Sequence, residues 1–351
     1  MTAVETEDSA PVTTQSPPTP AITEESSRRP SALGVLEAYA LVVLLVGVGV
    51  FFSLYGPTSS TFPTSGNLQV LFGGQAVLAI VALAVLVPLI CGEFDLSVGA
   101  VAGLCSVVCA SALSSGVAVP LAVLLAIGLG MAFGIVNALL ITRVKINSFI
   151  ATLGVAAIVD GIVTQKTGGL AVVSNIPAIV TSFGSGNWLG IPRPAYVLAA
   201  VAVAVYYVLA HTPYGRYIQA LGSNREAARL VGLRTDLLLG LTFVAAGTLA
   251  GTAGALQVAR AGGADPRVGA TFLLPAFAAA FLSAAAIKPG KYNVGGTLVA
   301  VLFLAALNSG LNLTGTEPYV SQYVNGAALL IGVGLAVYLG RKRVRQATAR
   351  R

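Results

Sequence analysis

The chain has 351 residues, of which 56% are hydrophobic and 9% are charged, and its mean hydropathy is +0.86. Because soluble domains typically carry about 25% charged residues, this composition excludes an ordinary soluble protein. It predicts an all-α, polytopic membrane protein. The net charge of +7 does not indicate nucleic-acid binding, since the basic residues are scattered between apolar runs or gathered at the C-terminus.

Both ends of the chain are polar. Residues 1–32 are rich in Thr, Ser, Pro and Glu and contain no hydrophobic core region. We therefore expect a disordered acidic cytoplasmic tail, not a signal peptide. Residues 341–351 are predicted to be a basic cytoplasmic tail. Between the two tails, residues 33–340 are predicted to form the transmembrane domain.

The apolar runs predict about ten transmembrane helices. In chain order the expected spans cover about residues 33–55 and 69–91, a run ending near 115, 117–142, 148–164, 195–211 and 237–258, and three runs that end near 287, 313 and 340. For residues 69–115 the alternative is one continuous and one re-entrant element. Residues 165–194 are expected to be a long loop.

The basic residues are distributed unequally between the two sides of this topology. One side holds Arg28, Arg29, Arg143, Lys145, Arg216, Arg225, Arg229, Arg234, Lys288, Lys291 and the six basic residues of the C-terminal tail. The other side holds Lys166, Arg193, Arg260 and Arg267. An excess of Lys and Arg is typical of cytoplasmic loops, so both termini and residues 213–236 are predicted to be cytoplasmic.

Residues 213–236 form a well-charged polar segment between two apolar spans. Within it, residues 224–233 predict a short helix, with Ser223 or Asn224 as the N-cap and Gly232 as the C-cap glycine. One interpretation is a docking element for a soluble partner. The alternative is an ordinary cytoplasmic loop whose arginines only fix the topology.

Part of this segment resembles a known motif. Glu226, Ala227 and Ala228, followed after three residues by Gly232, resemble the EAA loop of ATP-binding-cassette (ABC) importer permeases. The longer string 215–233 is similar to that of the ribose/xylose/galactose-type permeases. The resemblance implies a coupling helix that rests in a groove of an ATPase subunit. Its expected coupling residues are Gly222, Asn224, Glu226, Ala227, Ala228 and Gly232.

The octapeptide 92–99 places two acids, Glu93 and Asp95, between two apolar runs. Acids inside a membrane are usually functional or shielded, but at a cytoplasmic turn they cost little. The octapeptide resembles the Gly-Gly-Ile/Phe-Asp-Leu-Ser-Val-Gly signature of the same family, except that Glu93 stands at the second glycine. Gly92, Asp95, Ser97 and Gly99 are therefore candidates either to line the path or to form a helix break.

Three further candidates lie elsewhere. Residues 137–154 resemble the family's segment ending in Thr-Leu-Gly, which nominates Thr152, although its hydroxyl is also expected to bond to its own helix. Asp160 is the most plausible acid inside a span, facing either the lumen or the outer solvent. Asn308 belongs to a block, residues 273–310, that resembles another conserved-looking part of the family.

Other features predict packing only. The pairs Gly130/Gly134 and Gly247/Gly251 have the spacing of close helix contacts. The three cysteines are expected to be buried hydrophobic residues, so no metal site is predicted. The sequence contains no phosphate-binding loop and no catalytic constellation. We therefore expect no catalytic, cofactor-binding or metal-binding residues, with ATP used by a partner subunit.

The resemblance implies an inner-membrane permease of a bacterial importer, which forms the path for a sugar or sugar-like solute. It also implies several partners: an ABC ATPase subunit, a second permease copy or a paralogue, an extracytoplasmic solute-binding protein and membrane lipid. The alternatives are a branched-chain amino-acid-type ABC permease and an ion-coupled secondary transporter. The scarcity of acids inside the predicted spans argues against the latter. The solute is not specified by the sequence.

Overall fold

The computed structural model describes residues 32–348, with side chains described from 39 to 338. The described part is helical apart from one small hairpin, which confirms the all-α class. The elements are α1 Ala32–Leu54, α2 Ser65–Gly74, α3 Ala76–Ile90, α4 Val98–Ser114, α5 Val119–Thr142, α6 Ser148–Thr167, α7 Ala178–Ser185, β1 Asn187–Trp188, β2 Ile191–Pro192, α8 Arg193–His211, α9 Pro213–Ser223, α10 Arg225–Leu230, α11 Thr235–Ala261, α12 Val268–Leu282, η1 Ser283–Ala285, α13 Val294–Leu313 and α14 Tyr319–Thr348. The predicted tail before residue 32, and the side chains of the basic tail, lie outside the described residues.

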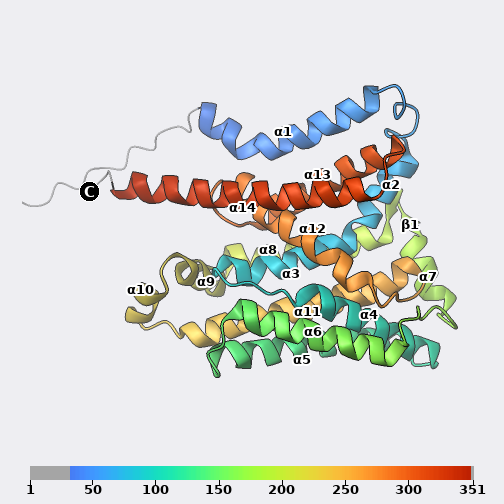
Figure 1. Ribbon diagram of the computed structural model, residues 1–351, viewed down its shortest axis with the longest axis horizontal. Helices are drawn as coiled ribbons and strands as arrows, with labels where there is room; N and C mark the ends of the chain where they lie inside the picture. Colours follow the sequence, from blue (N-terminus) through green and yellow to red (C-terminus); the bar gives the residue numbers. More distant parts are fainter. Residues whose placement is uncertain (1–31, 349–351) are drawn as a thin grey trace, which may run out of the picture.

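The long helices run side by side as a bundle (Figure 1). The start of α1, the elements α9 and α10 and the last turns of α14 lie at one end, on the left of the view. The elements α2, α7 and β1 lie at the other end. The start of α1 and the end of α14 thus share an end of the bundle with α9 and α10, and the cytoplasmic location of the two termini and of residues 213–236 stays a prediction.

Eight described helical segments are long and apolar enough to cross a membrane, with α2 and α3 together forming one of them. Two shorter apolar helices, 39–54 and 98–114, occupy the positions of the predicted first and third spans. The chain is therefore a multi-pass membrane protein. The count of ten crossings stays a prediction.

The expectation that residues 165–194 are only a loop was wrong. They contain α7 and the β1–β2 hairpin, in which Leu189 and Gly190 have positive φ angles of 52° and 79°. Two such residues suit the tight turn of a two-residue hairpin. Trp188 also packs edge-on against Phe183, and Tyr196 donates a hydrogen bond to the Trp188 carbonyl at 2.9 Å. These aromatic contacts supply the packing that a flexible loop lacks.

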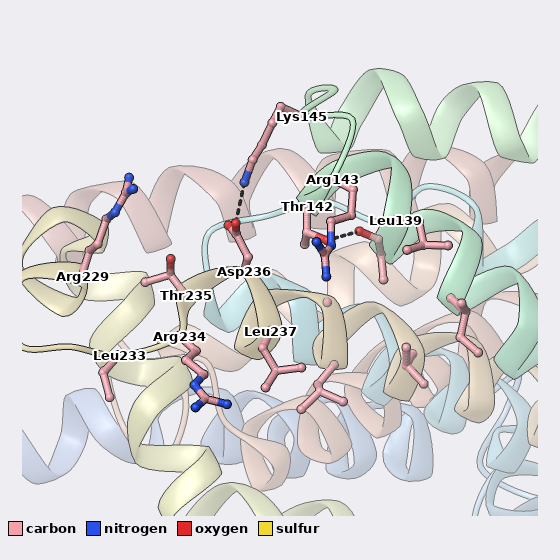
Figure 2. Close-up of a pocket in the computed structure, with 15 residues that line it drawn as sticks. Leu139, Thr142, Arg143, Lys145, Arg229, Leu233, Arg234, Thr235, Asp236 and Leu237 are labelled. Atoms are coloured by element: carbon pink, nitrogen blue, oxygen red, sulfur yellow. Dashed lines mark hydrogen bonds and ion pairs between the residues drawn. The ribbon is translucent and has the colours of Figure 1, made fainter.

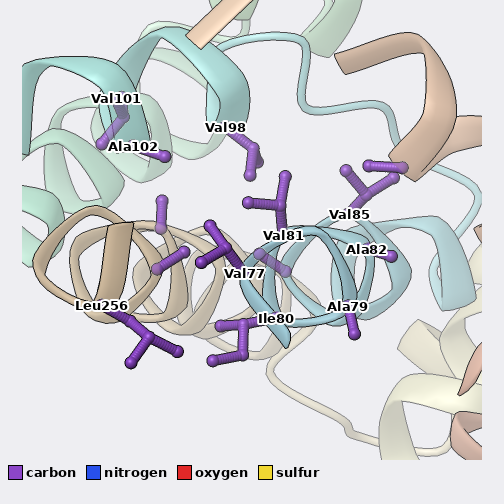
Figure 3. Close-up of a cluster of buried hydrophobic side chains, with 14 of the residues drawn as sticks. Val77, Ala79, Ile80, Val81, Ala82, Val85, Val98, Val101, Ala102 and Leu256 are labelled. Carbon is purple, nitrogen blue, oxygen red and sulfur yellow. The ribbon is translucent and has the colours of Figure 1, made fainter. Parts of the chain in front are cut away.

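Helix α3 occupies the centre of the bundle. Its residues from Ala76 to Leu89 are buried except Leu78, which is half-buried, and it contacts α4, α8, α11, α12 and α13. Figure 3 shows Val77, Val81 and Val85 of α3 within the apolar cluster, with Val98 of α4 facing Val81. A helix that is apolar on all sides can face either lipid or other helices, and the contacts of α3 place it in the interior.

Helices α5 and α11 pack closely through glycines. A Cβ atom on Gly130 would collide with the carbonyl oxygen of Gly247, and one on Gly134 with that of Phe243. A Cβ on Gly251 would lie 2.5 Å from the carbonyl oxygen of Ala126. The predicted use of both glycine pairs as packing faces is confirmed, and the two faces meet each other.

Candidate functional site

The chain leaves the central helix in a well-defined break, residues 91–97, which we call the helix break. Gly92 has a φ of +78°, its N–H donates to the carbonyl of Leu89 at 2.9 Å, and the N–H of Glu93 donates to that of Pro88 at 3.2 Å. This pattern is a Schellman cap, which needs a residue in the left-handed conformation. Glycine at position 92 supplies that conformation without strain.

Two hydroxyl groups of α6 hold the backbone of the helix break. The N–H of Phe94 donates to Ser148 Oγ at 3.4 Å, and the N–H of Leu96 donates to Thr152 Oγ1 at 3.1 Å. Ser148 and Thr152 are four residues apart, so they share one face of α6. Thr152 also donates to the carbonyl of Ser148 at 2.8 Å. The expected bond of Thr152 to its own helix is present, and the same hydroxyl binds the helix break.

Asp95 is buried, with an exposed fraction of 2%. Its Oδ1 atom accepts hydrogen bonds from the N–H of Ser97 at 3.0 Å and from Ser97 Oγ at 2.6 Å. Asn137 of α5 donates in turn to Ser97 Oγ at 2.8 Å. Asp95 therefore lies in the turn between α3 and α4, as one of the two alternatives had it, but it is buried there, and its burial is compensated by hydrogen bonds at the start of α4.

Residues 213–236, which we call the polar loop, contain two short helices. The predicted caps of the second helix, α10, are present. Asn224 Oδ1 accepts from the N–H of Ala227 at 3.0 Å, and Gly232 has a φ of +84°. The N–H of Leu233 donates to the carbonyl of Ala228 at 3.1 Å, which completes a second Schellman cap.

The first helix of the polar loop, α9, lies against the end of α3. A Cβ atom on Gly222 would collide with the carbonyl oxygen of Ile90, the last residue of α3. Ile218 and Leu221 are buried in this contact. Burial also raises the pKa of the Tyr214 phenol, whose hydroxyl has no hydrogen-bond partner in the described part of the chain. The polar loop is therefore packed directly onto the residue that precedes the helix break.

An ion pair makes a second connection. Arg225 Nη1, on the first residue of α10, lies 3.1 Å from Glu93 Oε1, and Ser148 Oγ donates to Glu93 Oε2 at 2.5 Å. The Glu93 side chain is 18% exposed and that of Arg225 is 49% exposed. Glu93, the residue that departs from the family signature, thus ties α10, the helix break and α6 together.

The outer surface of α10 is exposed. Glu226 and Ala227 face solvent, whereas Ala228 is buried against the bundle. Leu230 and Val231 are 88% and 76% exposed. Leu230 ends α10 and Val231 follows it, so two neighbouring apolar side chains are uncovered at this end of the bundle.

The other candidate residues, Gly99, Asp160 and Asn308, lie outside the contacts between the polar loop and the helix break. A Cβ atom on Gly99 would lie 2.6 Å from the carbonyl oxygen of Gly269, which identifies Gly99 as a contact between α4 and α12. Asp160 is exposed on α6 and has no ion-pair partner among residues 39–338. Asn308 of α13 donates to Asn325 of α14 at 3.4 Å. The residues with described side chains contain no cluster of His, Cys, Asp or Glu suited to a metal ion.

The helical form of α9 and the contacts of Ser148 and Arg225 with the helix break were not predicted from the sequence. The α9 helix could have been predicted, because Tyr214, Ile218 and Leu221 follow the four-and-three spacing of an apolar helix face. The contact between Arg225 and Glu93 joins residues too far apart in the chain for any local pattern to indicate it.

Comparisons with known proteins agree with this architecture. Residues 70–333 match the family described as "Branched-chain amino acid transport system / permease component". The ribose import permease protein of Escherichia coli (strain K12) is 33% identical over 302 residues, which cover 85% of this chain and 93% of that protein. The ribose import permease protein of Bacillus subtilis (strain 168) is 34% identical over 282 residues, covering 79% and 85%.

A more distant relative is the autoinducer 2 import system permease protein of Photorhabdus laumondii, which is 27% identical over 302 residues, covering 86% of this chain and 90% of that protein. No solved structure matches the chain. The family model covers most of the chain, and two ribose permeases are at least 33% identical to it. This chain therefore belongs to the family described as "Branched-chain amino acid transport system / permease component".

Proposed function

We propose that the chain is the membrane-spanning permease subunit of an ATP-driven importer and forms the path for a sugar or sugar-like solute. The identity to ribose, autoinducer 2 and arabinose permeases over most of the chain supports this function and favours it over amino-acid transport. In this proposal the chain hydrolyses no ATP itself. A partner ATPase does so, and an extracytoplasmic binding protein delivers the solute.

We further propose that the polar loop is the element through which the ATPase drives transport. The observation that carries this proposal is the double contact of the polar loop with the helix break. Gly222 lies against the carbonyl of Ile90, and Arg225 pairs with Glu93. When the ATPase subunits close and displace the polar loop, the contact of Gly222 on α9 and that of Arg225 on α10 both transmit the displacement to the end of the central helix.

The helix break is suited to respond to this displacement. Its backbone is held by side-chain hydroxyls of α6, not by a continuous helix ladder, so it can change its partners without unfolding a span. ATP binding shifts the permease between outward-open and inward-open states only if the ATPase binds these states with different affinities. The two contacts can produce this difference in affinity, because they link the position of the polar loop to that of the helix break.

The experiment that tests the transport function is uptake into proteoliposomes. The purified chain is reconstituted with its ATPase and binding protein, and uptake of labelled ribose, arabinose and leucine is measured with and without internal ATP. We expect ATP-dependent uptake of a sugar and none of leucine. Uptake of leucine alone, or sugar uptake that follows an ion gradient without ATP, would overturn the proposal.

A further inference from the structure

A groove of about 760 Å³ lies between the end of α5 and the start of α11, beside the polar loop. We call it the basic groove; it is lined by Ile135, Ala138, Leu139, Thr142, Arg143, Lys145, Arg229, Leu233, Arg234, Thr235, Asp236, Leu237, Gly240, Leu241 and Val244. It lies at the end of the bundle that is predicted to be cytoplasmic. Its volume is within the range of pockets that hold small-molecule ligands.

The rim of the basic groove carries four cationic side chains and one carboxylate. The carboxylate is already neutralised, because Lys145 Nζ lies 2.6 Å from Asp236 Oδ2, as Figure 2 shows. Lys145 adopts a φ of 65°, which is uncommon for a residue other than glycine. Arg143, Arg229 and Arg234 have no ion-pair partner among residues 39–338. The groove therefore presents unpaired guanidinium groups to any anion that enters it.

The wall of the groove below this rim is apolar and faces outward from the bundle. Leu139 of α5 and Leu237 and Leu241 of α11 are 51%, 55% and 43% exposed. These residues lie on helices long and apolar enough to cross a membrane, so their exposed faces are suited to contact hydrocarbon. Figure 2 shows Leu139 beside Arg143 and Leu237 beside Arg234, so the apolar wall begins directly at the cationic rim.

We propose that the basic groove binds an anionic glycerophospholipid of the cytoplasmic leaflet. The phosphate takes hydrogen bonds from the Arg143 guanidinium group, which matches phosphate geometry better than an ammonium group does, and Arg234, which Figure 2 shows apart from Arg143, adds a second positive charge to the groove. The acyl chains lie along Leu139, Leu237 and Leu241. Basic pockets between transmembrane helices on the cytoplasmic side are suited to lipid headgroups for this reason. The bound lipid would fix the angle between α5 and the polar loop.

The test is lipid retention by the purified full-length chain, measured by native mass spectrometry with phosphatidylglycerol and with phosphatidylcholine. We expect the wild type to retain phosphatidylglycerol selectively. The double variant Arg143→Gln/Arg234→Gln should lose affinity about 30-fold, since each cation near the membrane surface contributes about 1 kcal/mol. The matched control, Lys166→Gln/Arg267→Gln, removes two cations assigned to the opposite side and should retain the lipid as the wild type does.

A competition experiment shows whether the ligand of the basic groove is a lipid or a soluble anion. Soluble glycerol 3-phosphate should not displace phosphatidylglycerol at comparable concentration, because it lacks the chains that contact the apolar wall. Displacement by glycerol 3-phosphate would assign the groove to a soluble phosphate ligand and overturn the lipid proposal. Equal retention of the two lipids, or unchanged retention by the arginine variant, would also overturn it.

Discussion

Glu93 stands where the signature that residues 92–99 resemble has a glycine, and its contacts give this difference a physical meaning. A glycine at position 93 would offer no partner to Arg225 or Ser148. Here one carboxylate accepts from Ser148 and pairs with Arg225. Because the pair is partly exposed, it contributes little to folding, about 0–1 kcal/mol. Its consequence is expected in coupling, because it joins the polar loop to the helix break.

A charge exchange tests this role at residue scale. We expect Glu93→Gln and Arg225→Gln each to lower ATP-driven uptake about three- to five-fold, as for a contact worth up to about 1 kcal/mol. The exchanged pair Glu93→Lys/Arg225→Glu restores the attraction and should recover most of the uptake. ATP hydrolysis, measured in the same proteoliposomes, should continue in the single variants.

The matched control is Arg216→Gln, which neutralises an exposed arginine of α9 that has no ion-pair partner among residues 39–338. Its uptake should equal that of the wild type. If the exchanged pair transports no better than the single variants, the ion pair has no role in coupling.

At the scale of elements, the local signals predicted the caps of α10 and of the helix break. Asn224, Gly232 and Gly92 determine where helices begin or end through their own backbone preferences, so the sequence reveals them. Contacts between elements are different. Asn137 reaches Ser97 across 40 residues, and Thr152 reaches Leu96 across 56. Hydroxyl and amide groups of this kind have many possible partners, and only the packing of α5 and α6 selects among them.

The contact of α9 with α3 gives a prediction at this scale. Gly222→Leu should lower uptake strongly, because the new side chain meets the Ile90 carbonyl, which belongs to backbone and has little freedom to move. The protein should still insert, since the transmembrane helices themselves are unchanged. Insertion is checked by the yield of monodisperse protein, and coupling by ATP-driven uptake.

Gly161→Leu is the comparison variant for this prediction. A Cβ atom at position 161 meets no atom within 4 Å, so its leucine should be tolerated. Full uptake by Gly222→Leu would show that α9 need not lie close to α3 for transport.

For the whole molecule, composition was sufficient to predict a helical membrane protein, because a long apolar segment must satisfy its backbone within a helix. The central place of α3 does not follow from its apolar sequence, since α5 is similarly apolar and is mostly exposed on the outside of the bundle. The hairpin and α7 within residues 165–194 were not predicted from the sequence. The two-residue strands of the hairpin depend on the packing of Trp188 with its neighbours, which no local pattern shows. The exposure of Leu230 and Val231 likewise appears only when the helices are assembled.

Co-purification in mild detergent is the experiment that shows whether the exposed surface of α10 and of Val231 beside it binds the ATPase. The wild-type chain is expected to retain the ATPase. Leu230→Asp/Val231→Asp should lose it, since burying each apolar side chain contributes about 1.5–3 kcal/mol, a loss of more than tenfold in affinity. Leu189→Asp, at a residue 98% exposed at the other end of the bundle, should retain it. If the Leu230→Asp/Val231→Asp variant retains the ATPase at the wild-type level, this surface does not bind the ATPase.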